Sequence, residues 1–125
     1  MAMTDSKQSP FSLALSVIVV SADSGPALRD CVNSVLRSDL SLELILIDNA
    51  SRDGLPAAIE RAHANDARLQ LIYNHRNLGF GPAVNLAARR ARGQALLVLN
   101  PDCVLAEDDL PRLLALLAGR PKAGL

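Results

Sequence analysis

Aromatic side chains are scarce in this sequence. Its 125 residues include one tyrosine, two phenylalanines and no tryptophan, although half of the residues are hydrophobic. The core must therefore consist mainly of Leu, Val, Ile and Ala, a composition that suits helices layered on a sheet. This favours an α/β protein over an all-β sandwich. The length is enough for one compact domain, but short for an enzyme with separate donor and acceptor sites.

An excess of charge is also lacking, because 13 basic residues balance 13 acidic ones. No overall field would attract nucleic acid or an anionic membrane, so we expect no nucleic-acid partner. An anionic ligand must instead be held by local groups. Peripheral contact with a membrane and association into homo-oligomers are both compatible with this charge balance.

Cysteine and histidine are few, and long apolar runs are missing. Cys31 and Cys103 are far apart and show no metal-ligand spacing, and the same holds for His63 and His75. We therefore expect free thiols in a reducing compartment. No stretch approaches the ~20 apolar residues that span a bilayer. The segment before the apolar run 11–20 lacks the basic region of a signal peptide. These features predict a soluble, cytoplasmic protein.

Apolar periodicity, by contrast, is strong after residue 12. Residues 1–12 are expected to be a flexible lead-in, and 13–125 to form one domain. Four strands alternate with four helices, an order that right-handed crossovers turn into an open, mostly parallel, doubly wound sheet with helices on both faces. We expect this sheet to be cut after about four strands and to continue in sequence beyond residue 125. The predicted strands are 13–20, 42–47, 69–73 and 95–99, and the predicted helices are 26–38, 55–65, 84–91 and 110–117.

Three local signals mark helix ends. Ser24 is a candidate N-cap of the first helix, and Gly93 is a candidate C′ residue of the third. The acidic run 107–109 precedes the last helix, where the positive end of the helix dipole favours carboxylates. We interpret this run as helix-start charges.

Ligands of such sheets bind at the carboxyl ends of the strands, where three polar clusters follow strands here. They are 22–24, 48–53 and 100–102. The chain has neither a Gly-x-Gly-x-x-Gly after its first strand nor a Walker lysine loop. Dinucleotide cofactors and ATP in a P-loop are therefore not expected.

Local chemistry leaves two interpretations for each candidate group. Asp48 at the end of a strand either binds a ribose or base, or caps its own turn. Asp102 follows Pro101 and either holds Mg²⁺ or Mn²⁺ beside a diphosphate, or forms an Asx-type turn. The loop with Gly79 and Gly81 either receives a phosphate at a helix N-terminus or simply enters that helix.

Four segments of the sequence are considered together: Leu15 to Val20, Ile47 to Gly54, Asn77 to Asn85 and Leu99 to Asp102. They resemble the inverting family-2 glycosyltransferases with the GT-A fold, and the resemblance covers nearly everything from Leu13 onward. The loop Asn-Leu-Gly-Phe-Gly with the later Asn-Pro-Asp is most similar to the rhamnosyltransferase-type branch. The chain would correspond to the N-terminal, nucleotide-sugar-binding part of such an enzyme.

The resemblance implies specific roles. Asp48 would bind the base or ribose of a nucleoside-diphosphate sugar. The residues Asn77, Gly79 and Asn85 would lie beside this donor. In place of the family's aspartate-x-aspartate metal motif this chain has Asn100-Pro101-Asp102. Asp102 would thus be the single carboxylate ligand of Mg²⁺ or Mn²⁺, and Asn100 could instead bind ribose or sugar.

The chain departs from the family after the first strand, where Ala22-Asp23 replaces the usual Tyr-Asn pair. A base-stacking contact would be missing, while Asp23 could hydrogen-bond the nucleotide. The implied reaction is direct displacement with inversion, from a donor such as dTDP-rhamnose to a hydroxyl of a glycan or lipid-linked acceptor. Nothing after Asp102 matches the family's catalytic base, so we expect this chain alone to be inactive. The alternative is a non-catalytic nucleotide-binding or interaction module derived from such an enzyme.

Overall fold

The structure is a computed structural model, and it describes residues 13–118. The predicted lead-in, 1–12, lies outside the described residues. Strands and helices alternate as predicted, with boundaries that differ by a few residues from those predicted. In chain order the elements are β2 (Leu13–Ser21), α1 (Ala27–Leu36), β3 (Leu42–Asn49), α2 (Leu55–Ala62), β4 (Leu69–Asn74), α3 (Phe80–Arg90), β5 (Gly93–Leu99) and α4 (Asp109–Leu117).

The four strands form one sheet in the order β4-β3-β2-β5, and all three pairings are parallel. Ser21 at the end of β2 lies opposite Asp48 of β3, and Val19 lies opposite Leu99 of β5. The predicted α/β sheet is therefore confirmed. Because the pairings are parallel, the strands end at one common edge of the sheet, which we call the carboxyl edge.

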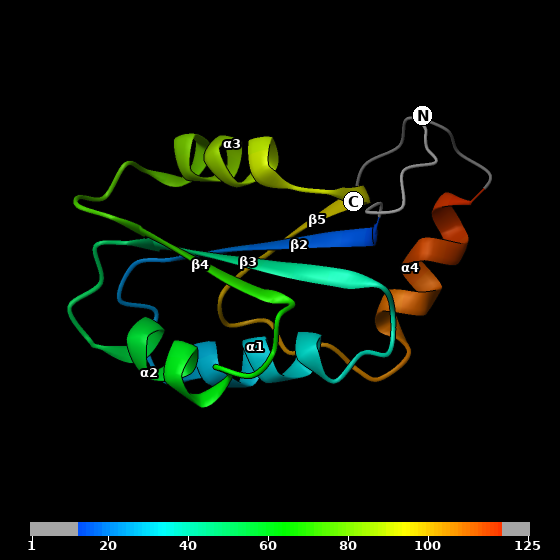
Figure 1. Cartoon of the computed structure of the whole chain (residues 1–125), viewed down its shortest axis with the longest axis horizontal. Coiled ribbons are helices and arrows are strands. Elements are labelled where there is room, and N and C mark those ends of the chain that lie inside the picture. Colours follow the sequence, from blue (N-terminus) through cyan, green and yellow to red (C-terminus); the bar gives the residue numbers. More distant parts are fainter. Residues whose placement is uncertain (1–12, 119–125) are drawn as a thin grey trace.

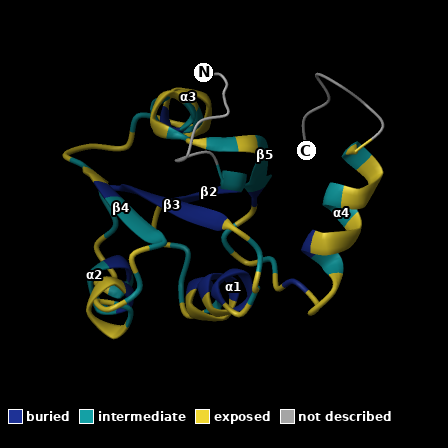
Figure 2. Cartoon of the chain, turned by 45° about the vertical axis from the view of Figure 1, so that its right-hand side comes forward, coloured by how far each residue is buried: buried dark blue, intermediate teal, exposed yellow. Residues whose placement is uncertain are grey.

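Helices cover both faces of the sheet (Figure 1), and each face carries its own core. Val17 and Val19 of β2 pack with α1 on one face, while Ile18 and Val20 face α3 on the other. The two central strands β2 and β3 are almost wholly buried (Figure 2), which explains their nearly continuous apolar sequences. On α3 the buried side chains are Ala83 and Ala87, which let the helix approach the sheet closely.

Gly93 was predicted to end the third helix, and this prediction was wrong. The helix ends at Arg90, and Gly93 is the first residue of β5. A Cβ atom at Gly93 would stand 2.4 Å from the backbone nitrogen of Ser16. Glycine is therefore required by the close approach of β5 to β2, and not by a helix cap.

Ser24 does not cap α1 either, because the helix starts at Ala27 without a side-chain cap. Its hydroxyl accepts a hydrogen bond from the Ser21 hydroxyl at 3.1 Å. The acidic run before the last helix behaves as expected, since α4 starts at Asp109. The Asp109 carboxylate accepts a hydrogen bond from the backbone N–H of Ala106 at 2.7 Å.

A buried carboxylate fixes the opposite, amino edge of the sheet. Glu43 is 1% exposed. It accepts hydrogen bonds from the Ser16 hydroxyl and the Arg92 backbone N–H, both at 2.6 Å. The Arg92 guanidinium lies 3.3 Å from the same carboxylate. A buried charge is tolerated when it is paired in this way, and these bonds hold the start of β5 against β2.

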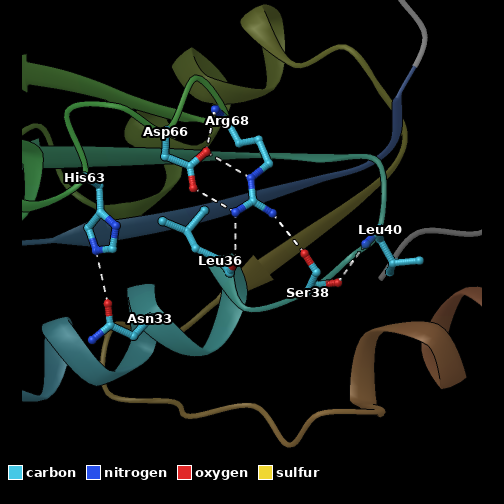
Figure 3. Close-up of polar contacts among 7 residues, drawn as sticks. All are labelled: Asn33, Leu36, Ser38, Leu40, His63, Asp66 and Arg68. Atoms are coloured by element: carbon cyan, nitrogen blue, oxygen red, sulfur yellow. Dashed lines mark hydrogen bonds and ion pairs between the residues drawn. The ribbon is translucent and has the colours of Figure 1, made fainter.

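A second polar network joins α1 to the connection between α2 and β4 (Figure 3). The Arg68 guanidinium donates to the carbonyl oxygens of Leu36 and Ser38, at 2.7 and 2.9 Å. It also pairs with Asp66 at 2.7 Å. Hydrogen bonding to Arg68 lowers the pKa of Asp66 to about 2. Arg68 thereby satisfies carbonyl groups left free at the C-terminus of α1.

Candidate functional site

The polar clusters predicted to carry the site meet at the carboxyl edge of the sheet. The connections after β2, β3 and β5 leave from this edge, because those strands are parallel and in register. The loop after β4 and the first turn of α3 lie there too (Figure 1). Residues far apart in sequence, from 22–26, 50–54, 75–79 and 100–103, thus share one end of the molecule.

Asp23 ties the first of these loops to the second. Its carboxylate oxygen Oδ1 accepts hydrogen bonds from the backbone N–H groups of Arg52 and Asp53, at 2.6 and 3.1 Å. The backbone N–H of Asp23 donates to the Ser51 hydroxyl at 3.0 Å. Asp23 has φ +53°, a left-handed conformation that aspartate tolerates better than most residues. One of its two oxygens is therefore already committed to the protein.

Asp48 combines both interpretations that its sequence left open. It is 7% exposed, and its Oδ1 accepts a hydrogen bond from the Ser51 backbone N–H at 2.8 Å. That contact is the turn interaction expected of a short acid after a strand. Its second oxygen makes no hydrogen bond to any residue between 13 and 118. It is therefore available to a ligand.

Tyr73 of β4 lies beside Asp48 in the register of the sheet. Its hydroxyl donates to Glu60 Oε1 of α2 at 2.7 Å. Burial raises the pKa of Tyr73 to about 12, and the negative charges of Glu60 and Asp48 add to the effect. The tyrosine is therefore neutral in the physiological range and serves as a hydrogen-bond donor.

Asn49 organises the loop after β4, a role that the sequence analysis missed. This side chain is 3% exposed. Its Oδ1 accepts from the Asn74 side-chain amide at 2.8 Å and from the Leu78 backbone N–H at 3.4 Å, and its Nδ2 donates to the Gly79 carbonyl at 3.1 Å. Strand alternation was the available signal, because it turns Asn49 away from Asp48 toward the face covered by α3.

The predicted donor-side residues of that loop are held close together. Asn77 Oδ1 accepts a hydrogen bond from the Gly79 backbone N–H at 2.8 Å. Gly79 has φ +84°, a conformation that favours glycine over any other residue. Phe80, the first residue of α3, is 57% exposed. Asn85 is exposed further along α3, and its side chain makes no hydrogen bond to the residues that the structure describes.

The turn Asn100-Pro101-Asp102 is closed by the backbone, since the N–H of Cys103 donates to the Asn100 carbonyl at 3.0 Å. The Asp102 side chain is exposed and has no hydrogen-bond partner within the described range. An Asx-type contact therefore does not use this carboxylate. It is free to bind a ligand from solvent.

The described residues offer a cation few protein ligands. No group of three or more His, Cys, Asp and Glu side chains among residues 13–118 could hold a metal ion. Hard cations beside a diphosphate need only one or two carboxylates, because phosphate oxygens and water complete the shell. A single carboxylate at Asp102 fits such a shared site, and it does not fit a metal held by protein alone.

The Cys31 thiol is no alternative ligand or nucleophile. Both cysteines are free, and Cys31 is buried. Burial raises the pKa of Cys31 to about 12, with further contributions from Cys103 and Asp102. The Cys31 thiol therefore stays protonated. No helix within residues 13–118 has the length and apolar character to cross a bilayer.

Comparison with known proteins gives a family match over almost the whole chain. The family model described as glycosyl transferase family 2 matches residues 16–124. Bacillus subtilis TuaG, assigned to teichuronic acid biosynthesis as a glycosyltransferase, is 31% identical over 107 residues, which are 85% of this chain and 42% of TuaG. The N-acetylglucosaminyl-diphospho-decaprenol L-rhamnosyltransferase of Mycobacterium tuberculosis is 29% identical over 122 residues, covering 88% of this chain and 39% of that protein. The chain thus spans about two fifths of each relative.

Solved structures share the fold. The Pyrobaculum calidifontis mannosyltransferase PcManGT, in complex with GDP-Man and Mn²⁺, superposes with a TM-score of 0.78 at 26% identity, over 86% of this chain and 33% of that one. Staphylococcus aureus TarS 1-349 with UDP-GlcNAc gives a TM-score of 0.76 at 23% identity, over 86% of this chain and 32% of that one.

Proposed function

This chain belongs to glycosyl transferase family 2, and from that premise we propose that it binds the nucleoside-diphosphate-sugar donor of a glycosyltransferase. The observation that carries the proposal is the meeting of Asp48, the 77–79 loop and the turn at Asp102 at one edge of the sheet. Open α/β sheets bind their ligands at this edge. The free oxygen of Asp48 and the free carboxylate of Asp102 supply polar groups there.

We assign the nucleoside to the Asp48 side of the edge. The second oxygen of Asp48 would accept hydrogen bonds from the base or ribose. Asp23, whose Oδ1 is already bonded to the 52–53 backbone, would offer only its other oxygen to the nucleotide. Asn77, Gly79 and the exposed amide of Asn85 would border the donor from the start of α3.

The diphosphate belongs near the turn after β5. Asp102 would hold Mg²⁺ or Mn²⁺ together with the diphosphate, and the exposed Asn100 side chain would bind ribose or sugar. Such a cation supplies positive charge that stabilises the leaving diphosphate. PcManGT, which shares the fold, contains Mn²⁺ with its GDP-Man, and this supports the assignment.

The proposed reaction transfers the sugar to a hydroxyl of a glycan or lipid-linked acceptor. The acceptor oxygen forms a bond to the anomeric carbon as the bond to the diphosphate breaks, which inverts the configuration. The acceptor's proton passes to a base that we do not assign to any residue of this chain. The similarity to the mycobacterial L-rhamnosyltransferase favours dTDP-rhamnose as the donor.

Calorimetric titration with dTDP, UDP and GDP, with and without Mn²⁺, tests the proposal. We expect one nucleotide to bind, and Mn²⁺ to tighten its binding at least about tenfold, the effect of ~1.4 kcal/mol. Asp102→Asn should abolish the gain from Mn²⁺. Asp108→Asn removes an equal charge from an exposed helix start and should keep the gain.

The outcomes separate the parts of the proposal. A protein that binds none of the three nucleotides would lack the proposed donor site. That result would favour the alternative, a non-catalytic interaction module. Binding that does not respond to Mn²⁺ would remove the cation from Asp102 and leave the nucleotide site standing.

A further inference from the structure

The segment that carries Asp102 has little structure of its own. Between β5 and α4, residues 100–108 form neither helix nor strand. Three backbone hydrogen bonds involve the segment among the described residues. The N–H groups of Cys103, Asp109 and Arg112 donate to the carbonyls of Asn100, Ala106 and Asp108, at 3.0, 3.1 and 3.1 Å. A chain so weakly self-supported must be held by its neighbours if Asp102 is to keep one position.

The neighbour that holds the segment is α1. The Leu105 backbone N–H donates to the Ser34 hydroxyl at 3.0 Å, and the Arg37 guanidinium donates to the Leu105 carbonyl at 3.4 Å. The Cys31 thiol donates to the Asn100 carbonyl at 3.5 Å, a weak bond to the oxygen that also closes the turn. Residues three apart lie on one side of a helix, so Cys31 and Ser34 of α1 and the C-cap residue Arg37 form a continuous line, here called the α1 ridge.

Ser34 is the centre of this ridge. It is 7% exposed, and its hydroxyl also donates to the Cys31 carbonyl at 2.7 Å. The hydroxyl therefore uses both its donor and its acceptor capacity within the protein. Leu105 itself is buried, so its backbone N–H would lose its partner if Ser34 lacked the hydroxyl.

The 100–108 segment is not closely packed against α1 along its whole length, so packing does not make the hydrogen bonds from α1 unnecessary. A pocket of about 320 Å³ separates the C-terminal part of α1 from the start of α4. The side chains of Ser34, Arg37 and Ser38 in its lining are already bonded within the protein. The pocket is lined by Ser34, Arg37, Ser38, Ala106, Glu107 and Leu110.

We propose that Cys31, Ser34 and Arg37 are positioning residues, which fix the backbone from Asn100 to Leu105 so that Asp102 is preset for the cation and diphosphate. This inference rests on the proposed donor site. Preorganisation of this kind matters most for a site with one protein carboxylate, because no second acid compensates if Asp102 moves.

Hydrogen exchange of the ligand-free protein tests the first half of the inference. Ser34→Ala should speed exchange of the Leu105 amide at least about fivefold relative to amides of β2 and β3, the effect of losing one hydrogen bond. Ser34→Thr keeps a hydroxyl and should restore protection. Asn33→Ala removes the side chain beside Ser34 on α1, which contacts His63 instead of the segment (Figure 3). This variant should change exchange neither at the Leu105 amide nor at the amides of β2 and β3.

Nucleotide titration with and without Mn²⁺ tests the second half. In Ser34→Ala we expect the affinity gain from Mn²⁺ to fall at least about fivefold, with metal-free affinity within about twofold of wild type. Ser34→Thr should recover the gain, and Asn33→Ala should retain it. The exposed Arg37→Ala, expected to fold normally, should give a smaller loss in the same direction.

The two measurements distinguish a failure of this inference from a failure of the proposed function. Faster exchange at Leu105 with an unchanged Mn²⁺ gain would mean that the ridge is only structural, and would overturn the inference. Unchanged exchange in Ser34→Ala would overturn it as well. A wild-type protein that binds no nucleotide contradicts the proposed function, and the exchange result still decides whether the ridge holds the segment.

Discussion

Three short polar side chains each bond to the backbone of a loop that is distant in the sequence. Asp23 binds the 52–53 backbone, Asn49 binds the 78–79 backbone, and Ser34 binds Leu105. Each of these groups holds a loop in place, while oxygens at Asp48 and Asp102 stay unbonded within residues 13–118. Loop-holding hydrogen bonds and unbonded carboxylate oxygens thus occur together, which favours a rigid site.

Asp48→Asn separates the two functions of Asp48. The amide oxygen of asparagine can still accept the bond from the Ser51 N–H, but the second, negative acceptor is replaced by a donor. Calorimetry should show about tenfold or greater loss of nucleotide affinity, as expected when a charged hydrogen bond is lost. The free energy of unfolding should change by less than about 1 kcal/mol.

Asp53→Asn is the matched control for this prediction. Asp53 lies in the same loop, and its carboxylate bonds to backbone N–H groups of Gly25 and Leu55. We expect this variant to bind nucleotide nearly as well as wild type. Equal losses in both variants would show that loop charge, and not the Asp48 oxygen, governs binding.

At the level of elements, two glycines differ in the space around them. Gly93 begins β5 where a Cβ atom would meet the backbone of Ser16 at 2.4 Å, whereas nothing lies within 4 Å of a Cβ at Gly81 in α3. Backbone cannot move aside as a flexible side chain can. We therefore expect Gly93→Ala to lower the free energy of unfolding by more than about 2 kcal/mol, by disturbing the β2–β5 pairing.

Gly81→Ala should have the opposite effect, because alanine is the better helix former. We expect a gain of up to about 1 kcal/mol in urea unfolding. If Gly93→Ala were as stable as wild type while Gly81→Ala gained stability, β5 would be able to shift away from β2 without cost. The position of β5 determines where Asp102 lies, so this pairing bears directly on the site.

Across the whole molecule, the amino and carboxyl edges of the sheet have different roles. The amino edge carries the buried Glu43 and the Arg68 network, which join strands and helices. The carboxyl edge carries the loops that we assign to the donor. The residues that we assign to the donor are therefore separate from these two networks.

The Arg68 network makes stability depend on pH. The pKa of Asp66 is lowered from 3.8 to about 2 in the folded chain, so its pair with Arg68 stabilises the fold above about pH 4. That contribution should be lost as pH falls from about 4 to about 2. Both side chains are a quarter to a third exposed, so solvent screening limits the effect to about 1 kcal/mol.

Urea unfolding of wild type and Asp66→Asn between pH 2 and pH 7 checks this expectation. The variant should be less stable at pH 7, and the difference should vanish toward pH 2. Asp108→Asn removes an exposed acid whose Arg112 contact is long, at 3.8 Å, and should follow the wild-type curve. A difference between wild type and Asp66→Asn that persists at pH 2 would speak against an electrostatic origin.

The sequence by itself determined the elements and the edge where ligands bind. Apolar runs such as 42–47 and the periodicity of α1 depend on neighbours within a few residues, so they are legible without a fold. Parallel pairing followed from the βα alternation, and it brings Asp48 and Asp102 to one edge whatever the strand order. The roles of the seven predicted site residues remain predictions.

Only the tertiary structure decided the strand order, the role of Gly93 and the partner of each polar side chain. No local sequence pattern could explain Gly93, because its constraint comes from Ser16, 77 positions earlier in the chain. The bonds of Asp23, Asn49 and Ser34 likewise reach across about 30 to 70 residues. Periodicity records which face of an element is buried, but a hydrogen bond depends on the distance and angle between two atoms, and folding alone sets these.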